Sequence, residues 1–464
     1  MQTQTQPERA AADGSRRLTL IAMSLGFCVV QLDVSVVNVA VKSIGASLGG
    51  GVSALQLIVS AYTVTFAAFI LTAGALGDRI GAKRLFIAGF VVFTLASVAC
   101  GLAPSLGVLV AARAVQGIGA AVLVPSSLTL LNHAFPEPDA RARAIGFYLA
   151  GASLSLSGGP LVGGVLISTL GWRSIFFINV PVAIAGIYLT IGYARETPRA
   201  SGRGVDPPGQ LAAAVALVAL VSATIAGGAH GFGDPLVLAG FAVFALAGAS
   251  FVIIEHRSAR PMLPLGLFRS STFSACALIG LLINTAFYGL IFTFSLLFQR
   301  EQHLSPLQTG LALGPVMVAV TLANLASGSI AQRFGPRAAV AGGAVLLAAG
   351  CAGLLGIDPG TGYAAVVAQM FALGFGCGVI VPTITSELLG SVERSWSGVA
   401  AGTLNTLRQA GSAIGVALFG SLIASRFITG VHAALAVSVG LVVVIGGLAP
   451  LLAGRRRPRV SAVD

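Results

Sequence analysis

The chain has 464 residues, of which 56% are apolar and only 9% charged, and its formal net charge is +12. Soluble domains carry about 25% charged residues, so this composition excludes a soluble globular protein and indicates an integral membrane protein. Continuous apolar runs of about 20 residues favour helices, because strands of membrane β-barrels alternate over about 10 residues. We therefore expect an all-α polytopic membrane protein.

The apolar runs predict fourteen transmembrane helices, each long enough to cross about 30 Å of hydrocarbon. The expected spans are residues 18–40, 54–76, 85–102, 105–131, 143–168, 174–194, 209–228, 235–254, 271–298, 306–330, 338–356, 361–387, 397–424 and 432–453.

The distribution of lysine and arginine predicts the orientation of these spans. With a cytoplasmic N-terminus, 21 of the 27 basic residues lie in cytoplasmic segments, 4 in outer segments and 2, Arg113 and Arg408, within spans. This asymmetry follows the positive-inside rule, so both termini are expected in the cytoplasm. The basic residues are dispersed over short loops and form no nucleic-acid-binding face.

The first span contains an acidic residue, in the stretch QLDVSVVNVA (31–40). A carboxylate near the bilayer centre costs several kcal/mol unless it is paired, solvated or protonated. Asp33 lies nine residues before Lys42 and Arg113 eight residues after Ser105, which places both about 12 to 13 Å deep. We expect them to contact each other or share a water cavity, in which Asp33 switches between charged and protonated forms. A static ion pair is the alternative.

Two further polar residues are expected in a substrate cavity near this pair. Gln116 follows Arg113 by three residues on the same helical face, and Asn38 is expected on the face adjoining Asp33. Their amides would bind a substrate or relay water. Hydrogen bonding between helices alone is the alternative.

The loop between spans 2 and 3 reads GALGDRIGAKR (74–84). Glycine permits tight turns, a carboxylate suits the positive end of the following helix dipole, and the basic residues can pair with acids at a neighbouring helix end. We expect a charge latch on a cytoplasmic gate, with an ordinary positive-inside loop as the alternative. The residues concerned are Gly74, Asp78, Arg79, Gly81, Lys83 and Arg84.

Span 5 combines small residues with an internal proline in GASLSLSGGPLVGG (151–164). Glycines let helices touch, and proline kinks a helix by removing a backbone hydrogen bond. The residues concerned are Gly158, Gly159, Pro160, Gly163 and Gly164.

Span 13 carries a basic residue near the midplane. Asn405, Arg408 and Ser412 share a helical face, and Arg408 lies about 17 Å from the inner end of its span. It faces the central cavity or bonds helix carbonyls. Glu387, the nearest acid of that half, ends span 12 and is interpreted as an interfacial charge.

Internal repetition indicates two related halves. Gly74, Arg79, Gly81 and Lys83 recur as Gly328, Arg333, Gly335 and Arg337 at an offset of 254 residues; Gly117, Gly119 and Pro125 recur as Gly374, Gly376 and Pro382 at 257; and Gly159 and Gly163 recur as Gly411 and Gly415 at 252. Spans 1–6 therefore repeat as spans 9–14, a transporter architecture, although duplication in a non-transporting protein would give the same pattern.

The repeat also predicts the domain organisation. Spans 7 and 8 are an inserted hairpin between polar, proline-rich connections at 194–209 and 255–270. The expected units are an N-terminal half (1–200), the hairpin with its linker (201–256), and a C-terminal half with a basic tail (257–464).

Enzymatic and metal chemistry have no support in the sequence. There is no phosphate-binding Gly-x-x-x-x-Gly-Lys-Ser/Thr loop, and the five histidines lack metal-ligand spacing. The five cysteines fall within predicted spans, where they behave as small hydrophobic residues. We expect no enzyme activity, cofactor, metal site or nucleic-acid partner.

The combined motifs resemble the fourteen-span drug:H⁺ antiporters of the major facilitator superfamily. GALGDRIGAKRL is similar to the superfamily's loop 2–3 motif, ARAVQGIGAA to its span 4 motif and SGGPLVGG to the antiporter motif of span 5. LDVSVVNVA, GWRSIFFINVPV and NTLRQAGSAIGVAL resemble segments of spans 1, 6 and 13 of the fourteen-span group.

The resemblance implies alternating access of two six-helix halves, with export driven by proton entry. It makes Asp33 and Arg113 the proton-coupling pair, Asp78 and Arg79 gate residues, and 158–164 the antiporter motif. The chain departs from the pattern at Val41-Lys42, where the family often has Leu-Pro, and at Gln332, the counterpart of Asp78 in the second half. No further membrane acid is evident, which argues against dications as preferred substrates.

The sequence thus predicts a monomeric, proton-driven exporter of small amphipathic organic compounds in a bacterial cytoplasmic membrane. A nutrient facilitator or symporter of the same fold, and a non-transporting receptor or scaffold, are the alternatives.

Overall fold

The computed structural model describes residues 6–198, 206–258, 261, 263–356, 363–392 and 397–452. Within these ranges the chain is helical and contains no strand. The elements are α1 (Gln6–Leu48), α2 (Val52–Ile80), α3 (Ala82–Gly101), α4 (Leu106–Ala134), α5 (Pro138–Leu170), α6 (Ser174–Phe177), α7 (Asn179–Tyr193), α8 (Pro207–His230), α9 (Pro235–Arg257), η1 (Leu265–Arg269), α10 (Ser271–Leu296), η2 (Leu297–Glu301), α11 (Pro306–Ala312), α12 (Gly314–Phe334), α13 (Pro336–Gly353), α14 (Tyr363–Gly390), α15 (Ser397–Ser425), α16 (Phe427–Leu448) and η4 (Ala449–Leu451).

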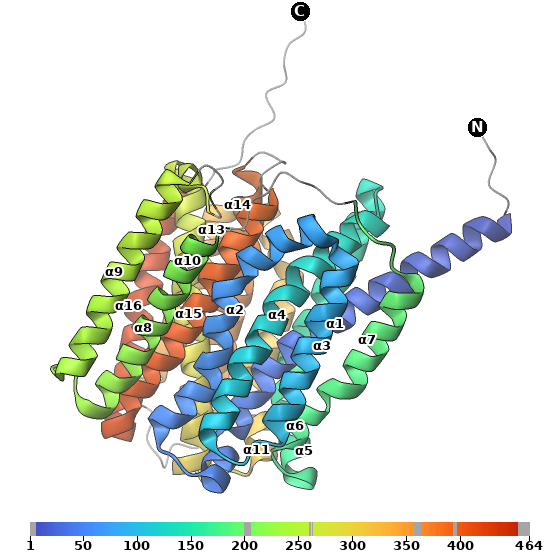
Figure 1. Ribbon diagram of the computed structural model, residues 1–464. Coiled ribbons are helices and arrows are strands. Elements are labelled where there is room, and N and C mark those ends of the chain that lie inside the picture. Colours follow the sequence, from blue (N-terminus) through green and yellow to red (C-terminus); the bar gives the residue numbers. More distant parts are fainter. Residues whose placement is uncertain are drawn as a thin grey trace, which may run out of the picture.

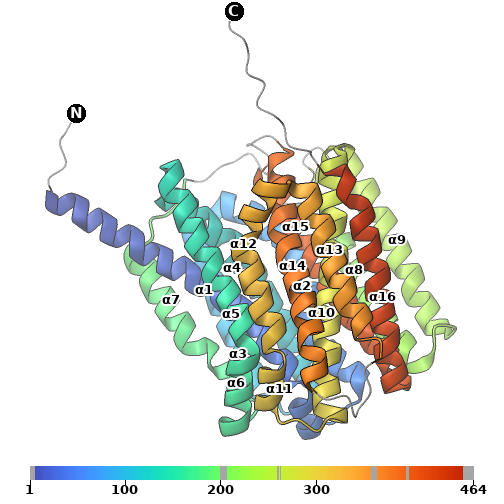
Figure 2. The ribbon, with the colours of Figure 1, turned by 180° about the vertical axis from the view of Figure 1, so that it is seen from behind.

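The described residues form 14 helical segments that are long and apolar enough to cross a membrane, which confirms the predicted number of spans. They run roughly side by side as one bundle (Figures 1 and 2). The start of α1 and the end of α16 lie at one end, which we call the termini end. The opposite end, which carries the connection from α1 to α2, is called the far end. The predicted domain boundary at residue 200 and the basic tail lie outside the described residues.

Two predicted spans are each broken into two helices. The sixth consists of α6 and α7, separated at Ile178, and the tenth of α11 and α12, separated at Leu313. A proline follows each break, Pro181 and Pro315, and proline cannot donate the backbone hydrogen bond that a continuous helix needs. Hydropathy alone does not reveal such breaks, because the apolar run continues through them.

Corresponding residues of the repeat occupy corresponding places in the fold. Gly81 joins α2 to α3 with φ +101°, and Gly335 joins α12 to α13 with φ +87°. Residues with a Cβ rarely adopt such angles, so both junctions require glycine. Gly117 packs against the backbone of α2, and Gly374 against the equivalent helix α12. The internal repeat is therefore structural as well as sequential.

The first helix of each half packs against glycines of the fifth. Gly159 and Gly163 face α1, and their counterparts Gly411 and Gly415 face α10. A Cβ added at Gly415 would overlap the Thr285 carbonyl oxygen and lie 2.9 Å from the carbonyl carbon. Close approach of the two backbones thus depends on the missing side chain.

Substitution of Gly415 by valine is expected to lower the thermal stability of the purified protein. Overpacking a close-packed interface costs about 1–3 kcal/mol, and here the obstacle is backbone, which cannot move aside as a side chain can. Gly440→Val is the matched control, because a Cβ at Gly440 meets nothing within 4 Å. Equal melting temperatures for the two variants would contradict this packing.

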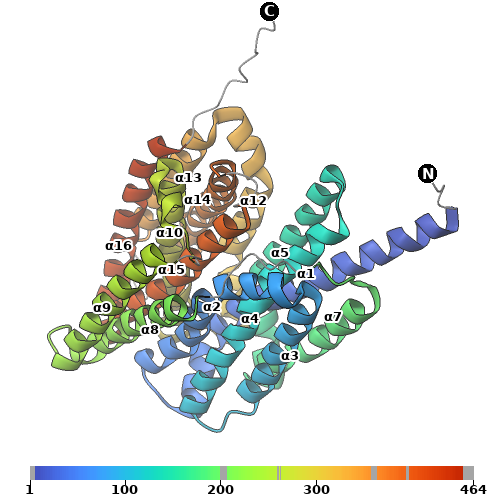
Figure 3. The ribbon, with the colours of Figure 1, turned by 45° about the horizontal axis from the view of Figure 1, so that its top comes forward.

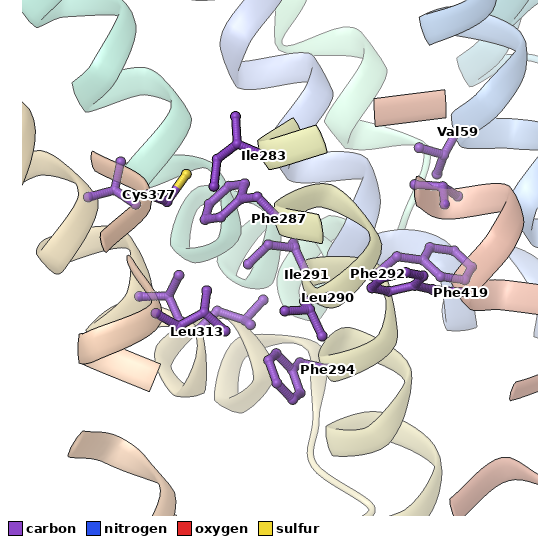
Figure 4. Packing of buried hydrophobic residues seen from close by; sticks show 14 of the residues in the cluster. Val59, Ile283, Phe287, Leu290, Ile291, Phe292, Phe294, Leu313, Cys377 and Phe419 are labelled. Atoms are coloured by element: carbon purple, nitrogen blue, oxygen red, sulfur yellow. The ribbon is translucent and has the colours of Figure 1, made fainter. Parts of the chain in front are cut away.

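The two halves share one hydrophobic core toward the far end. The larger cluster of buried residues joins parts of α1, α2 and α4 to helices α10–α16. Figure 4 shows its centre, where α10 presents Phe292 and its neighbours between Val59 of α2, Phe419 of α15, Leu313 and Cys377.

A second cluster lies within α1–α7, nearer the termini end. Of the described residues beyond α7, Tyr288 packs against it, and Tyr288 also packs against the larger cluster. With the termini end tilted toward the viewer, the halves form two groups of helices, with α8 and α9 at one edge (Figure 3).

Hydrogen bonds also connect the halves near the far end. Ser295 donates to the Asn38 carbonyl at 2.6 Å, and Gln299 donates to the Val39 carbonyl at 3.1 Å. Lys42 donates to the Gln299 carbonyl within the π-helical turn η2. Across the bundle, Gln56 of α2 donates to two carbonyls of α15, one of them at 2.6 Å. We call these contacts the far-end seam. α1 continues as a helix through Val41 and Lys42, where the family often has Leu-Pro. Lys42 therefore supplies one of the contacts of the far-end seam.

The inserted helices lie outside this core. α8 packs along both α2 and α15, and Gln210 donates to the Ala68 carbonyl at 2.8 Å while Ser421 donates to the Thr224 carbonyl at 2.7 Å. α9 packs mainly on α8, and only 6% of its membrane-spanning window is buried. The hairpin therefore lies beside the contact between α2 and α15 and does not contribute to the centre of the bundle.

Candidate functional site

The expected contact between Asp33 and Arg113 is present. The Arg113 guanidinium donates to the Asp33 carboxylate at 2.5 Å, and the two side chains are 1% and 0% exposed. Removing two charges from water is costly, so the pair requires close geometry and further hydrogen bonds.

Two amides complete the surroundings of the Asp33 carboxylate. Gln116 donates to its Oδ1 at 2.9 Å, and Asn179 donates to the same atom at 3.2 Å. Asn179 also donates to Ser97 at 2.9 Å, and Ser97 donates to the Phe176 carbonyl at 2.8 Å. Since every group facing the carboxylate is a donor, the arrangement fits an ionised Asp33.

Arg113 is held by groups from several helices. Its Nε donates to the Ile58 carbonyl at 3.3 Å, and its Nη1 also donates to Gln116 at 2.8 Å. Its guanidinium carbon lies 4.3 Å from the centre of the Tyr62 ring and 5.9 Å from that of Phe176. Aromatic faces attract a cation, so the rings stabilise the arginine, whose side chain is almost fully buried.

The Asp33 site is therefore made by α1, α2, α3, α4, and the broken sixth span, all within the N-terminal half. Sequence reasoning missed Asn179, Ser97 and Tyr62. They are polar residues within predicted spans, but nothing in their spacing links them to Asp33, because the rotation of a broken helix cannot be read from its apolar run.

Asn38 makes no described hydrogen bond with the Asp33 site, and its role in a substrate cavity stays a prediction. Its amide donates to the Val34 carbonyl of its own helix at 2.9 Å, and its backbone carbonyl belongs to the far-end seam. Five residues along a helix rotate a side chain by about 140°, so Asn38 faces α10 while Asp33 faces α4.

The loop between α2 and α3 is fastened to the end of span 6. The Glu196 carboxylate accepts from the backbone N–H groups of Lys83 at 2.9 Å and Arg84 at 3.2 Å, and Thr197 accepts from that of Ala82 at 3.0 Å. Arg84 lies 3.9 Å from Glu196, and Lys83 donates to the Ile191 carbonyl at 2.9 Å. The carboxylate thus occupies the positive end of the α3 dipole, where it satisfies free N–H groups.

The contacts of Glu196, Thr197 and Lys83 join two parts of the N-terminal half and do not reach the C-terminal half. Arg79 is exposed and has no hydrogen bond or ion pair within the described part of the chain, Gly74 packs near Pro125, and the side chain of Asp78 lies outside the described residues. The role of this loop as a cytoplasmic gate stays a prediction.

Glu196→Ala is expected to destabilise the protein by about 0.5–2 kcal/mol, the usual cost of losing a helix cap. Glu137→Ala is the control, because Glu137 makes a solvent-exposed ion pair with Arg16, and such pairs contribute about 0–1 kcal/mol. The melting temperature of the purified protein measures both. A drop no larger for Glu196→Ala than for Glu137→Ala would show that the cap contributes little.

The glycine motif of α5 packs against α1 of its own half and against α11 of the other half. Gly163 lies against Val36 of α1, and a Cβ added at Gly163 would come within 2.5 Å of the valine side chain. Gly164 lies against Leu307 of α11, and a Cβ added at Gly164 would lie 2.7 Å from the Leu307 Cα. The Pro160 carbonyl abuts Gly310 of α11, whereas Gly158 has open space around it. α5 is thus wedged between α1 and the first helix of span 10.

The polar face of span 13 lies apart from the Asp33 site. Ser412 donates to the Arg408 carbonyl at 3.0 Å, which leaves the seryl group bonded to its own helix. Arg408 and Asn405 are partly exposed and make no side-chain hydrogen bond or ion pair with any described residue. Glu387 sits in the last turn of α14.

Comparisons with known proteins agree with this architecture. The family model of the Major Facilitator Superfamily matches residues 23–416. The methylenomycin A resistance protein of Streptomyces coelicolor is 38% identical, with 100% of this chain and 97% of the relative aligned. The multidrug resistance protein Stp of Mycobacterium tuberculosis is 36% identical, covering 88% and 76%, and the puromycin resistance protein pur8 of Streptomyces alboniger is 32% identical, covering 89% and 84%.

A solved structure supports the fold independently. The crystal structure of the human organic anion transporter MFSD10 (TETRAN) superposes with a TM-score of 0.64 over 94% of this chain and 99% of that one, at 18% identity. Identity this low is evidence for the fold alone. With the family model matching most of the chain and relatives above 30% identity along their length, the chain belongs to the Major Facilitator Superfamily of membrane transporters.

Proposed function

We propose that this protein exports small amphipathic organic compounds, antibiotics among them, from the cytoplasm in exchange for protons. The names of its relatives, which denote resistance to methylenomycin A, puromycin and several drugs, support export. The termini end faces the cytoplasm in this proposal, as the distribution of basic residues requires. No resident cofactor takes part, and the proton is the coupling ion.

The buried pair of Asp33 and Arg113 is the observation that carries the proposal. A carboxylate in the membrane-spanning part of a protein marks a proton or ion pathway by default, because its cost must be offset by function. Asp33 has one cationic and two amide donors, and water access changes the balance between its charged and protonated forms. Protonation would remove the attraction to Arg113 and so loosen α1 from α4.

α1 connects this site to the contacts between the halves. Asp33 is followed on the same helix by Asn38 and Val39, whose carbonyls accept from Ser295 and Gln299 of the C-terminal half in the far-end seam. A displacement of α1 on protonation therefore acts on the seam that closes the far end. In this proposal the far-end seam closes the protein toward the outside, and opening of the seam is the outward step of alternating access.

The proposal is tested by the direction of proton movement. The antibiotics named for the relatives are first screened for stabilisation of the purified protein, since a ligand that binds the native state raises its melting temperature. A compound that binds is then added to acid-loaded everted membrane vesicles. Export coupled to proton entry predicts that protons leave the vesicle lumen as the compound enters. Movement of protons in the same direction as the compound would instead establish a symporter, and flux without proton movement a facilitator.

A further inference from the structure

We propose that Arg408, together with Asn405, binds an anionic group of the transported compound, foremost a carboxylate. The preferred substrates would then be amphipathic organic acids in their ionised form. This inference rests on the proposed function in one respect: the anion is the substrate only if the protein is a transporter of such compounds. Binding of the anion to Arg408 does not depend on proton coupling.

Arg408 lies deep in the bundle. It is the twelfth residue of α15, which places it about 16 Å from the helix end near the termini. α15 is the helix of the C-terminal half that packs along α2 of the N-terminal half. The guanidinium is therefore carried by an element that borders both halves, at mid-membrane depth.

The charge of Arg408 has no counterpart in the described protein. Its Nε is buried and without a hydrogen-bond partner, and the side chain makes no described ion pair. Arg113, the other arginine within a span, has a carboxylate, an amide and a carbonyl as partners. Glu387 lies one helical turn beyond Ile384 of α14, toward the termini end, and makes no described ion pair with Arg408.

An unpaired cation in a membrane protein is costly unless water or an anion compensates it. The sequence also allowed Arg408 to donate to helix carbonyls, but its side chain makes no hydrogen bond with any described residue. Its partly exposed guanidinium is thus free to receive a ligand. An arginine presents a planar fork of N–H donors that matches the two oxygens of a carboxylate.

The surroundings of Arg408 fit the apolar part of such a ligand. Its aliphatic stem packs at Gly280 of α10, beside Leu404 and Ile384. Tyr288 and Cys377 lie within electrostatic range of the guanidinium. Because Tyr288 packs against the hydrophobic clusters of both halves, this site is at the boundary between them. Apolar walls around one charged group are typical of small-molecule sites.

Asn405 supplies a second polar group on the same face. It lies three residues before Arg408, one helical turn toward the termini end, and its amide has no described hydrogen bond. An anion held by Arg408 would be in reach of this amide. The cytoplasmic entry side of the proposed export route is the termini end, so Asn405 lies on the approach to Arg408.

The test measures binding to the purified full-length protein without any proton gradient. Three probes are used: anthracene-9-carboxylic acid, diphenylacetic acid and 1-naphthylacetic acid, each compared with its neutral primary carboxamide. Dissociation constants are obtained from the dependence of the melting temperature on ligand concentration. We expect each acid to bind about 10- to 100-fold more tightly than its amide, the range for a hydrogen bond to a charged group.

Variants assign this preference to the site. Arg408→Gln is expected to remove the preference for the acid, Arg408→Lys to retain part of it, and Asn405→Ala to weaken binding of the acid more than of the amide. Arg426→Gln, at an exposed position before α16, is the control and should keep the full preference. If the acids bind no more tightly than the amides, or if Arg408→Gln retains the preference, the anion site is wrong.

The outcome is distinguishable from that of the proposed function. Acid binding that depends on Arg408, in a protein whose substrate flux moves no protons, would overturn proton coupling and leave the anion site. Proton-coupled export with no dependence of acid binding on Arg408 would do the reverse.

Discussion

Asp33→Asn is expected to abolish accumulation driven by a pH gradient while leaving the protein folded. Asparagine has nearly the same shape, and its one oxygen can take the place of the Oδ2 that accepts from Arg113, although its NH2 then faces the donors Gln116 and Asn179. The amide neither carries a charge nor exchanges a proton near neutral pH. Uptake by everted vesicles with an imposed gradient should fall to the level of vesicles lacking the protein. Exchange of labelled for unlabelled substrate without a gradient should continue, because it requires no net proton transfer.

Asp234→Asn is the matched control for this substitution. Asp234 caps α9 by accepting from the backbone N–H of Leu236 at 2.8 Å, at the surface of the peripheral hairpin. Asparagine caps helices as well as aspartate does, so accumulation should be unchanged. Full accumulation by Asp33→Asn would remove Asp33 from the coupling mechanism.

Arg113→Gln is expected to be the most destabilising of the charge substitutions. It leaves the Asp33 carboxylate buried without its cation, and breaking a buried ion pair from one side costs about 3–5 kcal/mol. The double variant Asp33→Asn, Arg113→Gln should be more stable than the sum of the single losses implies, because neither charge then remains unpaired. The melting temperatures of the four proteins measure this coupling.

The control for Arg113→Gln is Arg426→Gln, which removes an exposed arginine. Its melting temperature should match that of the unmodified protein. Additive losses in the double variant would mean that Asp33 and Arg113 do not depend on each other, despite their contact.

The number of spans and the pairing of Asp33 with Arg113 were accessible from the sequence for physical reasons. Apolar runs have to match the thickness of the hydrocarbon, and two charges of opposite sign at equal depth have few other partners in a membrane. Gln116 was found because three residues on a continuous helix share a face.

The remaining parts of the site depend on geometry that the sequence does not contain. Asn179, the first residue of α7, donates to Asp33, but the rotation of that helix about its axis cannot be read from its apolar run. Glu196 stands in a polar connection after span 6, and only tertiary packing brings it to the start of α3.

The glycines of α5 illustrate the same limit. Their spacing indicated close helix packing, but which helix each one meets is decided by the arrangement of the two halves. The structure distributes them between α1 for Gly159 and Gly163 and α11 for Gly164. Of these glycines, Gly164 lies at a contact between the halves, which must rearrange if the halves are to move.

The central claim is that Asp33 carries the proton that export exchanges for substrate. The most direct measurement is the pH change when a bound compound is added to the purified protein in weakly buffered solution. The measurement is repeated at falling pH with a non-ionisable ligand, so that only the protein can release protons. At the acidic end of the series, where Asp33 holds a proton before binding, proton release is predicted for the unmodified protein and none for Asp33→Asn. Equal proton release from the two proteins would contradict the claim.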